Sequence, residues 1–104
     1  MNFKQFIESK IPIYRGISVV NRKGGRRGSY WTPDPEWARQ FSQTGNEIKT
    51  SVIDSNDVLK LDPLPKATSE EEFDKALELA KQQGYLAVWI DEGPREPNSI
   101  FVLN

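Results

Sequence analysis

The stretch from Ser69 to Ile90 combines a helix, a helix stop and a run of six apolar residues. Ser69 and Glu72 have the spacing of a capping box. The residues after Ser69 repeat an apolar stripe at helical intervals, made of Phe73, Ala76, Leu77 and Ala80. Gly84 is the residue type that most often ends a helix, so a helix is predicted from about 69 to 83. Residues 85–90, Tyr-Leu-Ala-Val-Trp-Ile, show no polar alternation, which predicts a strand buried on both faces.

Shorter elements are predicted on both sides of this unit. Alternating or apolar segments predict strands over residues 11–17, 29–32, 47–53, 58–61 and 100–103. Helical spacing predicts a helix over 2–10, and Asp34 followed by Pro35 predicts another that runs through Phe41. This order predicts an α+β fold, in which small helices pack on a curved, mixed or antiparallel split sheet. No internal repeat or domain boundary is visible in residues 1–104, so we expect a single domain.

Composition excludes several kinds of chemistry. The 104 residues include no cysteine and no histidine, which removes thiol nucleophiles, disulfides, histidine bases and the usual zinc ligands. Any catalysis must therefore use carboxylates, hydroxyls, lysine, arginine, tyrosine or a bound cofactor. With 14 basic and 15 acidic side chains the formal net charge is −1, which argues against a dedicated nucleic-acid binder. There is no apolar run of about 18 residues and no signal-peptide core, so we expect a cytoplasmic protein without a membrane partner.

Arg15 is the most informative single residue. Strand alternation puts it on the same face as Ile11, Ile13 and Ile17, which is the side expected to be buried. An inward guanidinium is costly unless it meets an anion or several acceptors. A structural ion pair, or an arginine that extends to the sheet edge, would satisfy it. A bound phosphate would do so too, because the planar guanidinium pairs with two phosphate oxygens.

Aromatic residues and a hydroxyl follow the glycine-rich basic loop over 21–28. Tyr30, Trp31 and Thr32 end a predicted strand, and Phe41 projects from the last turn of the next helix. Two aromatic rings that face each other across a slot accept a flat ring by offset stacking. Ordinary core packing of large aromatics is the alternative interpretation.

The charged loops carry weaker signals. The basic side chains of loop 21–28 suit either phosphate or nucleic-acid binding or a solvated hairpin tip. Residues 70–72, three glutamates, are expected to be a solvated first helical turn that the helix dipole favours. Glu92 and Glu96 flank a Gly-Pro turn before the last strand, and a catalytic carboxylate has few other places in this chain.

Taken together, these segments resemble the ADP-ribosyltransferase fold, which includes diphtheria-like toxins, poly-ADP-ribose polymerases and small phage and bacterial transferases. Residues 14–16, Tyr-Arg-Gly, are similar to the first family motif, an aromatic followed by Arg or His on the first core strand. Residues 28–34 with Ala38 and Phe41 are similar to the second, in which an aromatic and a Ser or Thr precede a helix that ends in another aromatic. Residues 80–88 and 99–104 look like the helix, glycine and final strands of phage-type members, so the resemblance covers most of residues 11–104.

The resemblance implies an enzyme that uses NAD as substrate, releases nicotinamide and transfers ADP-ribose to an acceptor, with NAD glycohydrolysis as a variant. The acceptor stays open, with a host protein among the candidates. Arg15 would contact the NAD phosphates or ribose, Thr32 would support the site, and two aromatic rings would hold nicotinamide between them. The NAD-binding residues implied in this way are Tyr14, Arg15, Gly16, Tyr30, Trp31, Thr32 and Phe41.

The chain departs from the family pattern at the glutamate that grips the nicotinamide ribose. Related sequences place this glutamate at the start of the last strand, where this chain has Ser99. We therefore expect Glu96 to be the catalytic carboxylate, which requires the bend at Pro97 to fold inward. The alternative is a non-catalytic protein-binding module on the same fold, which would bind a partner protein and perform no chemistry.

Overall fold

A computed structural model describes residues 10–16, 28–40 and 48–103 of the chain. Its strands are β1 (Lys10–Gly16), β2 (Gly28–Trp31), β3 (Ile48–Asp54), β4 (Val58–Leu59), β5 (Ala87–Ile90) and β6 (Ser99–Leu103). Its helices are α2 (Pro35–Gln40), α3 (Glu70–Gln83) and a short 3-10 turn, η1 (Ser55–Asp57). The α+β class is confirmed. The helix expected over 2–10 lies outside the described residues, except for Lys10, which begins β1.

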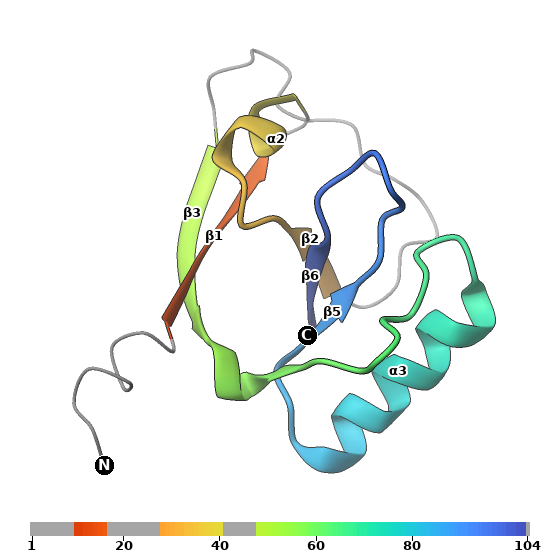
Figure 1. Ribbon diagram of the computed structural model, residues 1–104. Helices are drawn as coiled ribbons and strands as arrows, with labels where there is room; N and C mark the ends of the chain where they lie inside the picture. The colour runs from red at the N-terminus through yellow and green to blue at the C-terminus, as the bar shows by residue number, and fades with distance from the viewer. Residues whose placement is uncertain (1–9, 17–27, 41–47, 104) are drawn as a thin grey trace.

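The described strands form two sheets, which are connected by one backbone pairing. β1 and β3 make an antiparallel pair, and β2, β6, β5 and β4 make a second sheet in that order. Within the second sheet only the pairing of β4 with β5 is parallel. Tyr14 and Thr32 exchange two backbone hydrogen bonds, of 2.8 and 2.9 Å, which join β1 to the end of β2. The expected mixed, split sheet is therefore present, and Figure 1 shows its two halves facing each other.

Two apolar clusters stabilise this arrangement, one on each face of the larger sheet. On one face α3 covers the sheet with the buried side chains Phe73, Ala76 and Ala80, which pack against Leu59, Val88, Ile90 and Phe101. On the other face Ile13 and Ile53, from β1 and β3, pack against Val58, Ala87 and Ile100. Because β5 contributes to both clusters, it is buried on both faces, as its apolar run predicts.

Helix α3 begins and ends where the sequence predicts. The Ser69 hydroxyl accepts a hydrogen bond of 3.3 Å from the backbone N–H of Glu72, and Gly84 ends the helix with a φ of 80°. The second hydrogen bond of a capping box, from the Ser69 N–H to the Glu72 side chain, does not form among the described residues. The N–H of Ser69 donates instead to the carbonyl of Lys66, at 3.1 Å.

The buried strand is shorter than its apolar run. β5 begins at Ala87, and Leu86 before it has an exposed fraction of 54%. The backbone of Leu86, and not its side chain, connects this residue to the rest of the fold. Its N–H donates to the carbonyl of Asp57, and its carbonyl accepts from the N–H of Leu103. The prediction of burial on both faces is therefore wrong for Leu86. No helix in the described ranges is both long enough and apolar enough to cross a membrane.

Candidate functional site

Two hydroxyl residues lie next to each other where the two sheets meet. Trp31 pairs with Ile100 across β2 and β6, so the next residue of each strand brings Thr32 beside Ser99. Thr32 is also hydrogen-bonded to Tyr14 of β1, and Ser99 pairs with Ile90 of β5. Thr32 and Ser99 have exposed fractions of 6% and 7% and are the buried polar residues of the described part of the chain. We call this row of neighbours, Tyr14, Thr32 and Ser99, the sheet junction.

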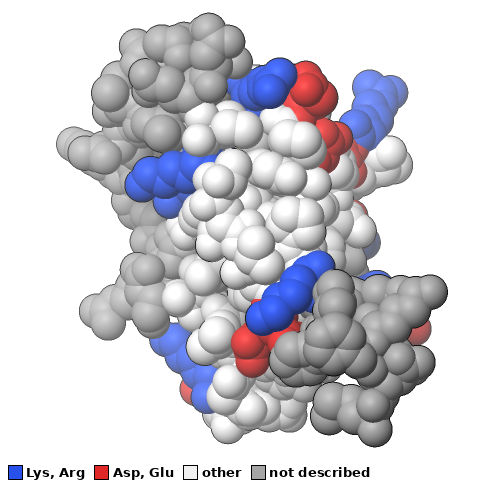
Figure 2. Space-filling view, turned by 90° about the vertical axis from the view of Figure 1, so that its left-hand side faces the viewer, with Lys and Arg blue, Asp and Glu red and all other residues white. Residues whose placement is uncertain are grey.

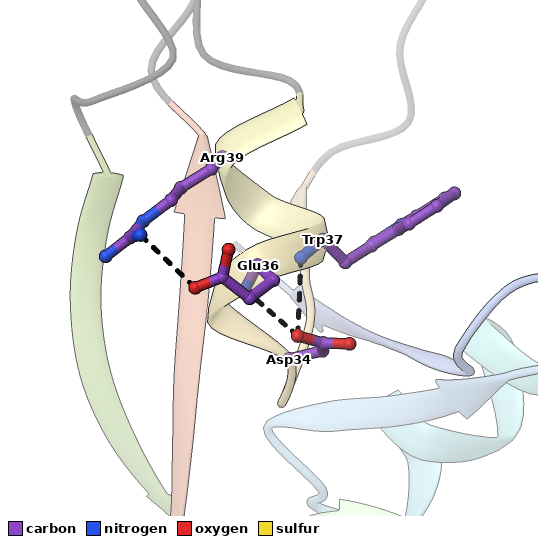
Figure 3. A network of polar contacts seen from close by, with 4 residues as sticks. All are labelled: Asp34, Glu36, Trp37 and Arg39. Atoms are coloured by element: carbon purple, nitrogen blue, oxygen red, sulfur yellow. Dashed lines mark hydrogen bonds and ion pairs between the residues drawn. The ribbon is translucent and has the colours of Figure 1, made fainter.

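Thr32 connects the sheet junction to α2. Its Oγ1 accepts a hydrogen bond of 3.1 Å from the N–H of Asp34. The Asp34 carboxylate in turn accepts from the N–H groups of Glu36 and Trp37, at 3.0 and 3.3 Å, and so caps the helix (Figure 3). Arg39 pairs with Glu36 at 3.2 Å on the exposed side of the same helix. Asp34 therefore has the capping role that its position before Pro35 predicts.

Ser99 holds a carboxylate, and that carboxylate belongs to Glu92. The Ser99 hydroxyl donates to Glu92 Oε1 at 2.5 Å, and the Glu92 side chain is half-buried. The backbone around Glu92 is fixed on both sides. Asp91 is bridged to the 65–67 segment by two hydrogen bonds of 2.9 Å, and its side chain accepts from the N–H of Gly93 at 2.8 Å. Glu92 thus sits in an ordered turn with its carboxylate directed at the start of β6.

Glu96 does not take the position expected for the catalytic carboxylate. It lies in the turn after Gly93, to whose carbonyl its N–H donates at 3.4 Å, and it is exposed. The bend at Pro97 leaves Glu96 exposed, and the carboxylate beside Ser99 is that of Glu92. The expectation that Glu96 approaches the start of β6 is therefore wrong, and Glu92 does so instead.

Arg15 lies on the predicted face of β1, but it is exposed. Ile13 on the same face is buried against the second sheet, whereas Arg15 lies two residues nearer to the end of the strand. The packing between the two sheets stops before Arg15, so its guanidinium is not enclosed. Its direct partner across the antiparallel pair is Lys49 of β3, which is also exposed. The sequence reading of an inward, buried arginine is wrong in this respect.

Of the remaining predicted site residues, Tyr30 and Trp31 lie on opposite faces of the larger sheet. Tyr30 packs edge-on against Phe101 and Phe73, with ring centroids 4.9 and 5.9 Å away, and keeps an exposed fraction of 44%. Trp31 points to the opposite face, where its indole N–H donates to the Ser29 hydroxyl at 2.8 Å. Gly16 ends β1 opposite Ile48. Phe41, the expected second wall of the aromatic slot, lies outside the described residues, as does most of the basic loop over 21–28.

Within the described residues, the buried hydroxyl residues Thr32 and Ser99 are therefore neighbours, and Ser99 holds the Glu92 carboxylate. Two cations, Arg15 and Lys49, lie on the nearby strands β1 and β3. Figure 1 shows that the loop before β6, helix α2 and the Gly16 end of β1 gather at the same end of the molecule. Sequence reasoning named Glu92 together with Glu96 but chose Glu96. It missed Lys49, which carried no signal until its register with Arg15 was known.

Carboxylate or other acidic groups do not form a metal-binding cluster within the described residues. Comparison with known proteins adds no assignment: no protein-family model matches the chain, and no curated protein or solved structure matches it either.

Proposed function

We propose that this protein binds NAD, breaks the bond between nicotinamide and ribose, and transfers the ADP-ribose to an acceptor group or to water. The observation that carries the proposal is the sheet junction together with the carboxylate that Ser99 holds. Its support is specific, because the segments around Tyr14 and Thr32 each resemble an NAD-binding motif and are here direct hydrogen-bonded neighbours. The third element of that resemblance, the start of the last strand, adjoins them.

The chemistry assigned to Glu92 is electrostatic. When the glycosidic bond breaks, its electron pair leaves with nicotinamide and positive charge develops on the ribose. A fixed carboxylate stabilises that charge without having to reorganise during the reaction. The acceptor, or water, then forms the new bond to the ribose carbon and gives up its proton. Ser99 is the positioning residue in this scheme, because its hydroxyl fixes one oxygen of Glu92.

Binding of NAD is assigned to the surroundings of the junction. Arg15 directly follows Tyr14 of the sheet junction along β1, and its exposed guanidinium is accessible to the phosphates of a ligand. Tyr30, two residues before Thr32, keeps nearly half of its surface exposed and offers an aromatic wall to a flat ring. Both residues belong to β-strands whose backbones are fixed by neighbouring strands, which preorganises the site.

Nicotinamide release by the full-length chain tests this function, with two glutamates of the same loop as matched variants. Glu92→Gln should retain NAD binding and lower the rate on the order of a hundredfold, the size expected for losing one electrostatic group. Glu96→Gln makes the same chemical change at an exposed position and should leave the rate within about twofold. Loss of activity in Glu96→Gln alone would show that Glu92 is the wrong carboxylate. A wild-type protein that releases no nicotinamide would overturn the function itself.

Ser99→Ala separates positioning from chemistry in the same assay. This variant keeps the Glu92 carboxylate but removes the hydroxyl that holds it. We expect a rate between those of the wild type and Glu92→Gln, with the loss in kcat rather than KM. A rate equal to that of the wild type would contradict the positioning role of Ser99.

A further inference from the structure

Arg15 and Lys49 form a pair of like charges across β1 and β3. They are directly opposite each other in the antiparallel register, so their side chains leave the same face of the sheet, with Cβ atoms about 4.5–5.5 Å apart. Like charges in this arrangement destabilise a sheet. Neither side chain has an ion pair or hydrogen bond to any of the described residues. The pair therefore has no structural partner in this part of the molecule that would account for it.

On β1 and β3 themselves, the described residues on the same face as this pair include a hydroxyl and no acidic side chain. On the same face of the two strands, the residues beyond the pair are Ile11, Ile13, Ser51 and Ile53. Ser51 is exposed and follows Lys49 by two residues, so its hydroxyl lies on the same side of β3. The one acidic residue of β1 and β3, Asp54, lies on the opposite face, across from Lys10 at the far end of the strands.

The distribution of charge on this side of the molecule agrees with that description. Figure 2, which looks at the side that carries β3, shows acidic side chains near the top and in the lower part of the described surface, next to basic ones, and mostly uncharged surface between these two regions. Helix α2 packs against β1 and carries Glu36, whose carboxylate is paired with Arg39 at 3.2 Å (Figure 3). An anion that approaches Arg15 and Lys49 thus meets two cations and a hydroxyl on the same face of the strand pair.

We propose that Arg15, Lys49 and Ser51 form a binding site for a diphosphate group. Two cations side by side suit two linked phosphates better than one, because each phosphate then has a cation of its own. Arginine supplies a planar, two-pronged donor, lysine a compact point charge, and serine an additional hydrogen bond. That the diphosphate is the one in NAD rests on the proposed function, whereas the anion site itself rests only on the pairing of β1 with β3.

Calorimetric titration with inorganic pyrophosphate at constant ionic strength tests this site, with inorganic phosphate as the comparison. We expect pyrophosphate to bind the wild-type chain more tightly than phosphate does. Arg15→Gln and Lys49→Gln should each weaken pyrophosphate binding about tenfold or more, as expected for the loss of a hydrogen bond to a charged group. Lys10→Gln is the matched control, because it removes the same charge from the same strand pair on the opposite face, and it should bind within about twofold of wild type.

The outcomes separate this site from the proposed function. Absence of pyrophosphate binding, equal affinity for phosphate, or unchanged affinity in Lys49→Gln would overturn the diphosphate site. An equal loss in Lys10→Gln would also overturn it, since binding would then follow net charge alone. If pyrophosphate behaves as expected but NAD binds wild type and Lys49→Gln equally well, the anion site and the function both stand, and the assignment of the NAD diphosphate to this site is refuted. If pyrophosphate behaves as expected but NAD does not bind, the site stands and the function is refuted.

Discussion

At the scale of single residues, Phe73 is among the largest fully buried side chains of the described residues. Its side chain is fully buried and its ring makes edge-on contacts with Tyr30 and Phe101. We expect Phe73→Ala to lower the free energy of unfolding by about 3–5 kcal/mol, because it leaves a cavity under α3. Leu86→Ala removes a large apolar side chain that is more than half exposed and should change stability by no more than about 0.5 kcal/mol.

Urea denaturation at equilibrium measures both variants. Equal losses in Phe73→Ala and Leu86→Ala would contradict the packing described for α3. The comparison also tests the aromatic cluster, because the Tyr30 ring rests on Phe73 and would lose one of its two described aromatic neighbours.

The residues of the candidate site show where sequence reasoning succeeds and where it stops. Thr32 and Tyr14 could be singled out because each belongs to a short local motif, although their mutual hydrogen bonds join segments that are distant in the sequence. Glu92 could not be chosen over Glu96, since the choice depends on an Asx turn and a serine seven residues away. The exposure of Arg15 also depends on distant residues, because it is set by where the packing between the two sheets ends.

At the scale of elements, α3 is the most strongly specified by local sequence. Ser69 caps it, Gly84 ends it in the left-handed conformation, and its apolar stripe covers the sheet. Ser69→Ala should lower the free energy of unfolding by about 1 kcal/mol, since it removes the acceptor for the Glu72 N–H. Thr68→Ala, at the exposed neighbouring position, is the control and should be nearly neutral. Thermal or urea unfolding checks both, and equal effects would contradict the capping role.

Strand boundaries were harder to predict than strand existence. The described strands lie within three residues of the expected ones, but the apolar run over 85–90 begins pairing only at Ala87. Hydrophobicity alone does not show this, because the Leu86 backbone is bound while its side chain faces solvent. The partner of each strand is likewise a property of the whole fold: β4 pairs with β5 across α3, and β2 with β6 at the end of the chain.

At the scale of the whole molecule, the two sheets should unfold together. Among the described residues, two hydrogen bonds join β1 to the end of β2, but β5 and β6 contribute side chains to both apolar clusters. We therefore expect a single two-state transition, with coincident curves from tryptophan fluorescence and far-ultraviolet circular dichroism. Two separate transitions would show that β1 and β3 form an independent unit, and would contradict the single-domain prediction.

The central proposal is that NAD binds at the sheet junction. Thermal unfolding with and without NAD tests the claim most directly, because a ligand that binds only the folded state stabilises it. At a hundred times its dissociation constant, NAD should add about 2.7 kcal/mol, which raises the midpoint by roughly 10 °C or more in a domain of this size.

Arg15→Gln and Lys10→Gln complete that measurement, since both remove one charge from β1 but on opposite faces. We predict that NAD raises the midpoint of thermal unfolding strongly for the wild-type chain and for Lys10→Gln, and much less for Arg15→Gln. No rise in the wild-type chain at millimolar NAD would contradict the central claim, and would favour a protein-binding module on the same fold.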